Sequence, residues 1–305
     1  GTNAFNGSVY VSGGVGAGAD GLSGSVVNTS FSRNPSIPMP FWPITTVSTP
    51  TNNQKPIFYW NASSPIGDEN GTLTGFNHTI LKYLYDVYGY ELVVDNYAPV
   101  FVNQNNYYPW PVALEPGTHT WKVRAHRSDG AVGDYTALQS FTIDTAATNR
   151  NTNFTTSQEL SARVGVYAYD DVIVVSGSTL NFTGNYTTYT LPVHNGKGVV
   201  LIAKSLTVQS NANISAVGKG YAVNKGPGSG TASGSYGGLG YSTPTGITYG
   251  SFLIPAELGS SGDTNVGGGA VTLIVSDTLN VSGIVEANSS NTCPGQYPGG
   301  GSGGS

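Results

Sequence analysis

The sequence has little charge, almost no cysteine and no long apolar run. Only 12 Lys and Arg and 17 Asp and Glu occur among 305 residues, which gives a net charge of −5. This balance excludes a nucleic-acid partner, because phosphate binding needs a concentration of cationic side chains. No stretch reaches the roughly 18 consecutive apolar residues of a membrane-spanning helix, so no membrane span is predicted in this chain.

What the chain has instead favours β-structure. Its 30 Val and 13 Ile outnumber its 17 Leu, and it also contains 19 Tyr. β-Branched and aromatic side chains fit a pleated, half-buried surface, whereas the helix formers Leu, Glu, Lys and Arg are scarce. The 43 Gly and 17 Pro supply tight turns between short strands. We therefore predict an all-β fold.

The residue types that carry catalysis are thinly spread. The single cysteine, Cys293, excludes a disulfide within this chain, and no histidine beyond His194 is there to activate its thiol. The histidines show no metal-binding spacing. Asp170 and Asp171 are adjacent, so a strand would point them to opposite faces, and they predict a turn cap rather than a pair acting on one glycosidic bond. We predict no enzyme, no cofactor and no metal.

Asn-x-Ser/Thr triplets are the best indication of the compartment. They occur 11 times, about twice as often as random placement of these residues would give. This excess predicts N-glycans on exposed positions of an exported protein. The alternative is that a composition rich in Asn, Ser and Thr produces triplets by accident. The predicted acceptors are Asn6, Asn28, Asn61, Asn70, Asn77, Asn153, Asn181, Asn185, Asn213, Asn280 and Asn288.

Composition divides the chain into four zones. Residues 1–34 are Gly-rich with short strand-like runs, and one interpretation is that they form part of a solenoid. Residues 35–55 are Pro-rich, which is typical of a stiff linker. Residues 56–145 show alternating apolar residues and few Gly. Residues 146–305 are again Gly-rich and contain a repeated pattern. Both ends of the chain indicate a piece of a longer, processed polypeptide.

The alternation in residues 56–145 predicts an antiparallel β-sandwich. Phe58 and Trp60 would share one face of a strand. After the Pro116-Gly117 turn, alternate residues of a longer strand share a face: His119, Trp121, Val123 and Ala125. With the closing strand Phe141-Thr142-Ile143-Asp144, this pattern resembles the fibronectin type III and immunoglobulin-like modules of large secreted prokaryotic proteins. The resemblance implies a spacer and says nothing about chemistry.

Residues 146–305 carry a repeated step. Thr179-Leu180-Asn181-Phe182, Ser205-Leu206-Thr207-Val208 and Thr278-Leu279-Asn280-Val281 each follow an apolar run. Such units stack, because one unit cannot bury its own apolar face. The Leu-x-Val steps and Gly-rich stretches resemble the right-handed parallel β-helix regions of large secreted surface proteins. The uneven spacing, with a Gly-rich insertion at 217–269, departs from that family, so an irregular β-solenoid or a sandwich stays open.

An aromatic loop at residues 103–110 is the candidate contact site. Tyr107, Tyr108 and Trp110 follow a run of amide side chains. Aromatic rings and amides suit stacking on a sugar ring or contact with a partner protein. The alternative is that these rings pack on the end of the sandwich or on a neighbouring module.

These patterns favour an extracellular structural protein. The hypothesis is an N-glycosylated subunit of a cell-surface filament, sheath, surface layer or adhesin stalk, whose partners are copies of itself or other surface proteins through strand edges. The composition indicates an archaeal cell surface or a virus of such a host. The alternative is a glycan-binding or glycan-cleaving exoprotein, such as a β-helix lyase or a viral tail spike, which would require three or more carboxylates in one groove.

Overall fold

The computed structural model shows an all-β chain. No helix occurs among the residues that it describes, and none of them therefore forms an apolar helix of membrane-spanning length. The antiparallel pair β1 (Val15–Gly16) and β2 (Ala19–Asp20) stands alone near the N-terminus. The described residues are 15–16, 19–20, 35, 37–44, 49–61, 87–162, 165–185, 198–230, 233–240, 247–250, 256–290 and 300–305.

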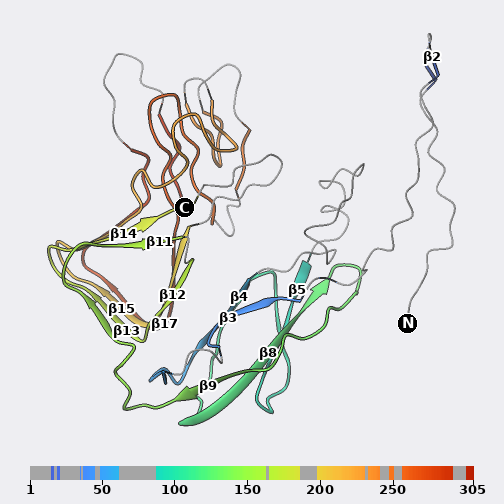
Figure 1. Ribbon diagram of the computed structural model, residues 1–305, viewed down its shortest axis with the longest axis vertical. Helices are drawn as coiled ribbons and strands as arrows, with labels where there is room; N and C mark the ends of the chain where they lie inside the picture. The colour runs from blue at the N-terminus through green and yellow to red at the C-terminus, as the bar shows by residue number, and fades with distance from the viewer. Residues whose placement is uncertain are drawn as a thin grey trace.

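Two antiparallel sheets form the first part of the structure (Figure 1). One has the order β3-β4-β7 and the other β6-β5-β8-β9. The strands of the first sheet are β3 (Met39–Trp42), β4 (Ile57–Asn61) and β7 (Tyr107–Pro109). Those of the second are β5 (Val87–Val94), β6 (Val100–Val102), β8 (Gly117–Arg127) and β9 (Gln139–Ile143).

The core between these sheets is aromatic, and it follows the predicted alternation. Phe58 and Trp60 of β4 are fully buried on one face, as expected from their spacing. Trp121 is fully buried beside them, with ring centroids 5.2 Å from Phe58 and 6.4 Å from Trp60. Val123 and Ala125 continue the same face of β8 into the core. The predicted strand at 117–125 is confirmed.

The second part is a curled parallel sheet made by successive passes of the chain. Each pass contributes one strand to a first sheet and one to a second, and all pairs between passes are parallel. The first sheet contains β10 (Thr152–Phe154), β13 (Asp171–Val174), β15 (Val199–Val208), β17 (Val271–Val281) and, on β15, β12 (Val166–Ala168). The second contains β11 (Gln158–Ser161), β14 (Thr179–Thr183), β16 (Asn213–Ser215) and β18 (Ile284–Glu286).

The register stacks apolar side chains in columns inside the curl. One column is Val172, Leu206 and Leu279, a second is Val174, Val208 and Val281, and a third is Leu180, Ile214 and Val285. The predicted equivalence of residues 205–208 with 278–281 is confirmed. The third predicted member, residues 179–182, is wrong, because β14 pairs with β16 in the other sheet while Asp171–Val174 occupies the place beside Ser205–Val208. Both strands of a pass bury alternate apolar residues, so their patterns look alike.

The 217–269 insertion packs mainly through backbone. Gly220 N–H donates to Gly267 O, and Gly259 N–H donates to Gly268 O, in segments with no regular strand. Residues 300–305 join this packing, since Gly268 N–H donates to Ser302 O. A Cβ on Gly267 would overlap the carbonyl group of Gly259, so only glycine permits this approach. Tyr221 and Leu258 are buried in the insertion.

A mixed apolar and polar junction holds the two parts together. Ile57 and Tyr59 of β4 point away from the aromatic core and pack with Trp42 against Ile202 and Ile274 of the parallel sheet. Within residues 35–55, predicted as a linker, β3 therefore belongs to the junction through Trp42.

The polar half of the junction centres on a buried carboxylate. Asp170 accepts hydrogen bonds from Thr51 Oγ1 at 2.5 Å and from Asn52 N–H at 2.8 Å. Arg150 Nε lies 3.8 Å from Asp170 Oδ1, and its guanidinium lies 3.9 Å from the Trp42 ring centroid. Burial lowers the pKa of Arg150, and the charge of Asp170 opposes that shift.

Candidate functional site

Between its two ends, the outer edge of the terminal pass, β17 and β18, is open; at the ends, Val271 N–H donates to Ser305 O and Gly304 N–H donates to Ala287 O. β18 pairs with β16 and β17 pairs with β15, and neither has a second strand partner among the described residues. The inward columns end here on apolar side chains that are partly exposed. Leu279 is 53% exposed, Val281 43% and Val285 40%, whereas Leu206, Val208 and Ile214 one pass earlier are fully buried. Ile284, on the outward face, is 55% exposed. We call Leu279, Val281, Ile284 and Val285 the open end.

The opposite end of the curl is closed by its own side chains. Phe154 of β10 and Leu160 of β11 are buried, although their strands also pair on one side only within the described residues. Tyr169 packs edge-on against Phe154 at 6.1 Å, and Ser161 N–H donates to the Tyr167 hydroxyl at 2.9 Å. The two ends of the curl are therefore chemically different.

The predicted glycan acceptors that the structure describes lie at the surface. Asn153, Asn280 and Asn288 are exposed, and Asn61, Asn181, Asn185 and Asn213 are half-buried. In β17, Asn280 lies between the inward residues Leu279 and Val281 and so faces outward. The acceptors outside the described residues are Asn6, Asn28, Asn70 and Asn77. Glycosylation of all eleven stays a prediction.

The aromatic loop residues are placed largely by packing. Trp110 is buried in the aromatic core, with its ring 5.9 Å from Phe58 and 5.3 Å from Tyr97. Tyr108 is half-buried against the same core, and Tyr107 packs at the junction. The placement of Trp110 favours the packing alternative for that residue. A contact of Tyr107, Tyr108 and Trp110 with a partner or glycan stays a prediction.

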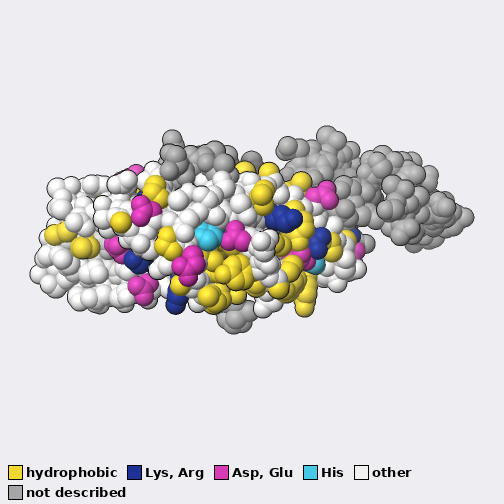
Figure 2. All heavy atoms as spheres, turned by 90° about the horizontal axis from the view of Figure 1, so that it is seen from below, with side chains coloured by type: hydrophobic (Ala, Val, Ile, Leu, Met, Phe, Trp, Pro, Cys, Tyr) yellow, Lys and Arg dark blue, Asp and Glu magenta, His cyan; other side chains and the backbone are white. Residues whose placement is uncertain are grey.

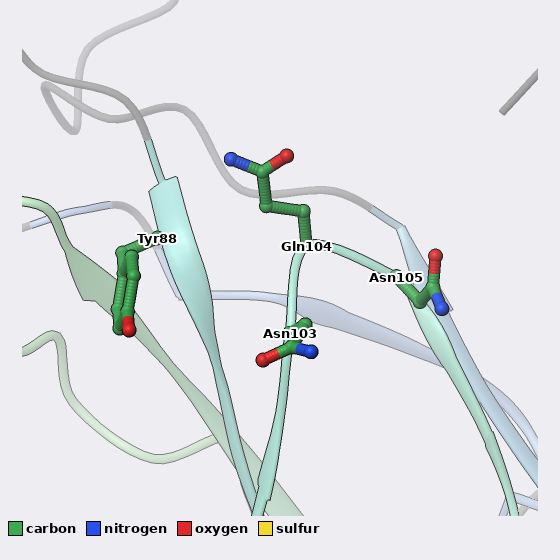
Figure 3. Close-up of a pocket in the computed structure, with 4 residues that line it drawn as sticks. All are labelled: Tyr88, Asn103, Gln104 and Asn105. Carbon is green, nitrogen blue, oxygen red and sulfur yellow. The ribbon is translucent and has the colours of Figure 1, made fainter. Parts of the chain in front are cut away.

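A shallow hollow of about 290 Å³ lies nearby, at the other side of the amide run. It is lined by Tyr88 of β5 and by Asn103, Gln104 and Asn105, and Figure 3 shows Asn103 between Tyr88 and Asn105. Tyr88 is exposed and its ring lies 5.4 Å from that of Phe101, which is also exposed. The sequence pattern does not predict this pair. By strict alternation Tyr88 would share the face of buried Tyr90, but Tyr88 lies at the register shift between Val87 and Gly89, where the alternation is broken.

The described carboxylates differ in their surroundings. Asp170 belongs to the junction, and Glu286 accepts a hydrogen bond from Ser215 Oγ at 3.2 Å. Asp263 and Asp277 are exposed. No cluster of three or more His, Cys, Asp or Glu side chains suited to a metal ion occurs in the part of the chain that the structure describes. Figure 2 shows charged side chains scattered over a mostly uncharged surface on the face that it presents.

A cluster of charged side chains lies on the face of β5 and β8 that points away from the aromatic core. Glu91 receives two hydrogen bonds of 2.9 Å from Arg124 Nη2, one from the Tyr135 hydroxyl, and faces His126 Nε2 at 3.1 Å. Burial would raise the pKa of Glu91, but these bonds outweigh it and lower the pKa. Lys122 and Arg124 lie over the Tyr135 ring at 4.3 and 4.5 Å. Every member has a partner, so the cluster joins β5 to β8.

Comparison with known proteins adds little. No family model matches the chain, and no curated protein matches it. One solved structure that resembles part of it is that of the alpha-L-rhamnosidase from Dictyoglumus thermophilum, with 16% identity and a TM-score of 0.25. The match covers 37% of this chain and 13% of the rhamnosidase chain. A likeness this weak carries no argument about function.

Proposed function

We propose that this chain is an extracellular structural protein, an N-glycosylated subunit of a cell-surface filament, sheath, surface layer or adhesin stalk. It assembles through strand edges. In this proposal the antiparallel part is an immunoglobulin- or fibronectin III-like spacer, and the curled parallel sheet is a β-solenoid. The proposed setting is the surface of an archaeal cell or of a virus of such a host.

The open end is the observation that carries this proposal. A strand edge with unused backbone groups is a template for another strand. Here the edge coincides with exposed Leu279, Val281 and Val285, so an added pass would gain both backbone hydrogen bonds and apolar burial. In a soluble protein that functions as a monomer, we expect such an edge to be covered, as aromatic side chains cover the β10–β11 end.

Two further features support a structural role. The low charge of the chain makes assembly insensitive to salt, because few charges have to be screened. The junction around Asp170 and Trp42 fixes the spacer to the parallel sheet, which suits a stiff rod. Glycans at outward positions such as Asn280 would shield the sides of the rod and leave its end accessible.

Electron microscopy of the native glycoprotein tests the proposal. We expect filaments or a lattice whose repeat contains this chain. Leu279→Asp, at the open end, should abolish assembly, because a desolvated charge would face the added pass. Leu138→Asp is the matched control, since Leu138 is 61% exposed, against 53% for Leu279, and lies outside the parallel sheet. A protein that stays monomeric at all concentrations and salt conditions would rule the proposal out.

A glycan-binding role is the second candidate, and the hollow beside Tyr88 favours it. Exposed Tyr88 and Phe101 present aromatic faces next to amide side chains, the combination that binds sugar rings. Glycan-array binding that is lost in Tyr88→Ala and retained in Tyr97→Ala, another exposed tyrosine, would support it. Absence of binding to any glycan by the wild-type protein would remove this candidate.

A further inference from the structure

The N-terminal sequence contains a close copy of the terminal pass. Residues 8–17, SVYVSGGVGA, align without gaps with residues 278–287, TLNVSGIVEA, and five of the ten positions are identical. The earlier pass at 205–216, SLTVQSNANISA, needs two more residues to turn the same bend. The spacing of the N-terminal sequence therefore matches that of β17–β18 and not the longer spacing of the earlier pass.

From this match and from the open end, we infer that residues 8–17 of a second copy form the next pass on β17–β18. The inference rests on the proposed function and specifies its contact. In parallel register, Val9 stacks on Leu279, Val11 on Val281 and Val15 on Val285. These pairs extend the three apolar columns of the curl by one layer.

The segment has a glycine at the position where the terminal pass requires one. Gly283 turns the bend between β17 and β18, and a Cβ there would overlap the carbonyl oxygens of Gln209 and Ala212 in the previous pass. In an added pass of the same length, the residue aligned with Gly283 lies at the same place in the bend. The segment provides Gly13 at that position. It also provides Gly14 opposite Ile284, and it carries no charged residue.

The alternative occupant of the open end is the β10–β11 end of a second copy. The chemistry of the two ends favours residues 8–17 instead. The β10–β11 end is filled by Phe154 and Leu160 under Tyr167 and Tyr169, so it presents no surface matched to exposed aliphatic columns. Within the segment, β1 pairs antiparallel with β2, and Figure 1 shows β2 far from the parallel sheet of its own chain. A pass from one copy on the open end of the next is a head-to-tail contact, which repeats into a linear assembly.

Cysteine cross-linking tests the contact in the full glycosylated chain. The tested variant carries Val9→Cys and Leu279→Cys, with Cys293→Ser to remove the native thiol. Stacked positions on parallel neighbours have Cα atoms about 5 Å apart, within the range of a disulfide. The register control pairs Val9→Cys with Val281→Cys, which lie two residues out of step. We expect oxidation to give a ladder of covalent oligomers about tenfold more abundant than in the control.

Complementation gives a second readout that does not depend on oxidation. A copy with Val9→Asp and Val11→Asp has a defective segment and an intact open end, whereas a copy with Leu279→Asp has the reverse defect. Each alone should be monomeric, and their mixture should form a dimer that grows no further. Sedimentation velocity separates these species.

The results also distinguish this inference from the proposed function. Filaments that form while the Val9–Leu279 pair gives no cross-link would overturn the inference and leave the structural role intact. A cross-link confined to monomers would place the segment on its own chain and overturn the second copy as occupant. Ladders with equal yield from the register control would refute the stacking. Absence of any assembly would overturn both.

Discussion

Replacement of the buried carboxylate of Asp170 tests the junction between the two parts. Asp170→Asn keeps the side-chain volume but turns one carboxylate oxygen into an amide group. One of the bonds from Thr51 Oγ1 and Asn52 N–H is then lost, and Arg150 stays buried without its counter-charge. Asp170 is 1% exposed and Arg150 9%, so solvent cannot replace these partners.

The magnitude follows from the contacts. A lost hydrogen bond to a charged group costs about 1.5–3 kcal/mol, and breaking a buried ion pair by removing one partner costs about 3–5 kcal/mol. The two overlap at the same carboxylate, and Arg150 keeps its contact with the Trp42 ring. We therefore expect the free energy of unfolding to fall by about 3 kcal/mol and the Tm to fall by about 10 °C.

The assay is thermal and urea unfolding followed by tryptophan fluorescence and circular dichroism. Asp171→Asn is the matched control, because Asp171 is the next residue, is half-buried and starts β13 without entering the junction. We expect it to change the Tm by less than about 2 °C. Equal shifts in the two variants, or no shift in Asp170→Asn, would refute the account of the junction.

Four other outcomes are expected. Gly283→Ala should lower the free energy of unfolding by about 1–3 kcal/mol, because its methyl group meets backbone, whereas Gly237→Ala, with nothing within 4 Å, should not; equal denaturant midpoints would contradict this. Ile202→Ala should cost about 2–5 kcal/mol at the junction, measured by urea unfolding. Hydrogen bonding by Arg127 lowers the pKa of Asp129 from 3.8 to about 2. Its stabilisation is therefore present above pH 4 and lost as the pH falls through 2; Asp129→Asn should lower the Tm slightly at pH 7 and not at pH 2. Peptide mass spectrometry of the native protein should find a glycan on Asn280, and only unmodified peptide there would contradict its assignment.

The first sheet pair shows how far local pattern can predict structure. The alternation around Trp121 predicted which side of β8 is buried, because neighbouring side chains on a strand point to opposite faces. The same rule did not show that Ile57 and Tyr59, on the other face of β4, are buried too. Ile202 and Ile274, which help to cover that face, lie more than 140 residues away in sequence, so no local window contains the information.

The repeat shows the opposite limit. The sequence similarity of Ser205–Val208 and Thr278–Val281 correctly predicts that they are equivalent, and they pair in the structure. Thr179–Phe182 was matched by the same letters and pairs elsewhere. Inward apolar residues alternate in every strand of a pass, so which strands pair depends on bend lengths and on the stacking of whole passes.

The aromatic loop and the open end were decided by tertiary contacts. Tyr107, Tyr108 and Trp110 looked alike in sequence, yet only the position of Trp110 beside Phe58 and Tyr97 makes it a core residue. Leu279 and Leu206 occupy equivalent places in the repeat, and one is exposed while the other is buried. The exposure of an inward side chain depends on whether another pass stacks on its strand. The repeat motif itself does not contain that information.

The sequence by itself determined that this protein is built of strands and turns, because a chain rich in Val, Tyr and Gly and poor in charge has few other ways to bury its apolar surface. It also determined the inward faces of individual strands. Only the tertiary structure decided that the passes stack in parallel, that one end of the stack is closed and the other open, and that Asp170 joins the two parts. These properties depend on contacts between residues distant in sequence, and such contacts form and stabilise the protein only when the whole chain has folded.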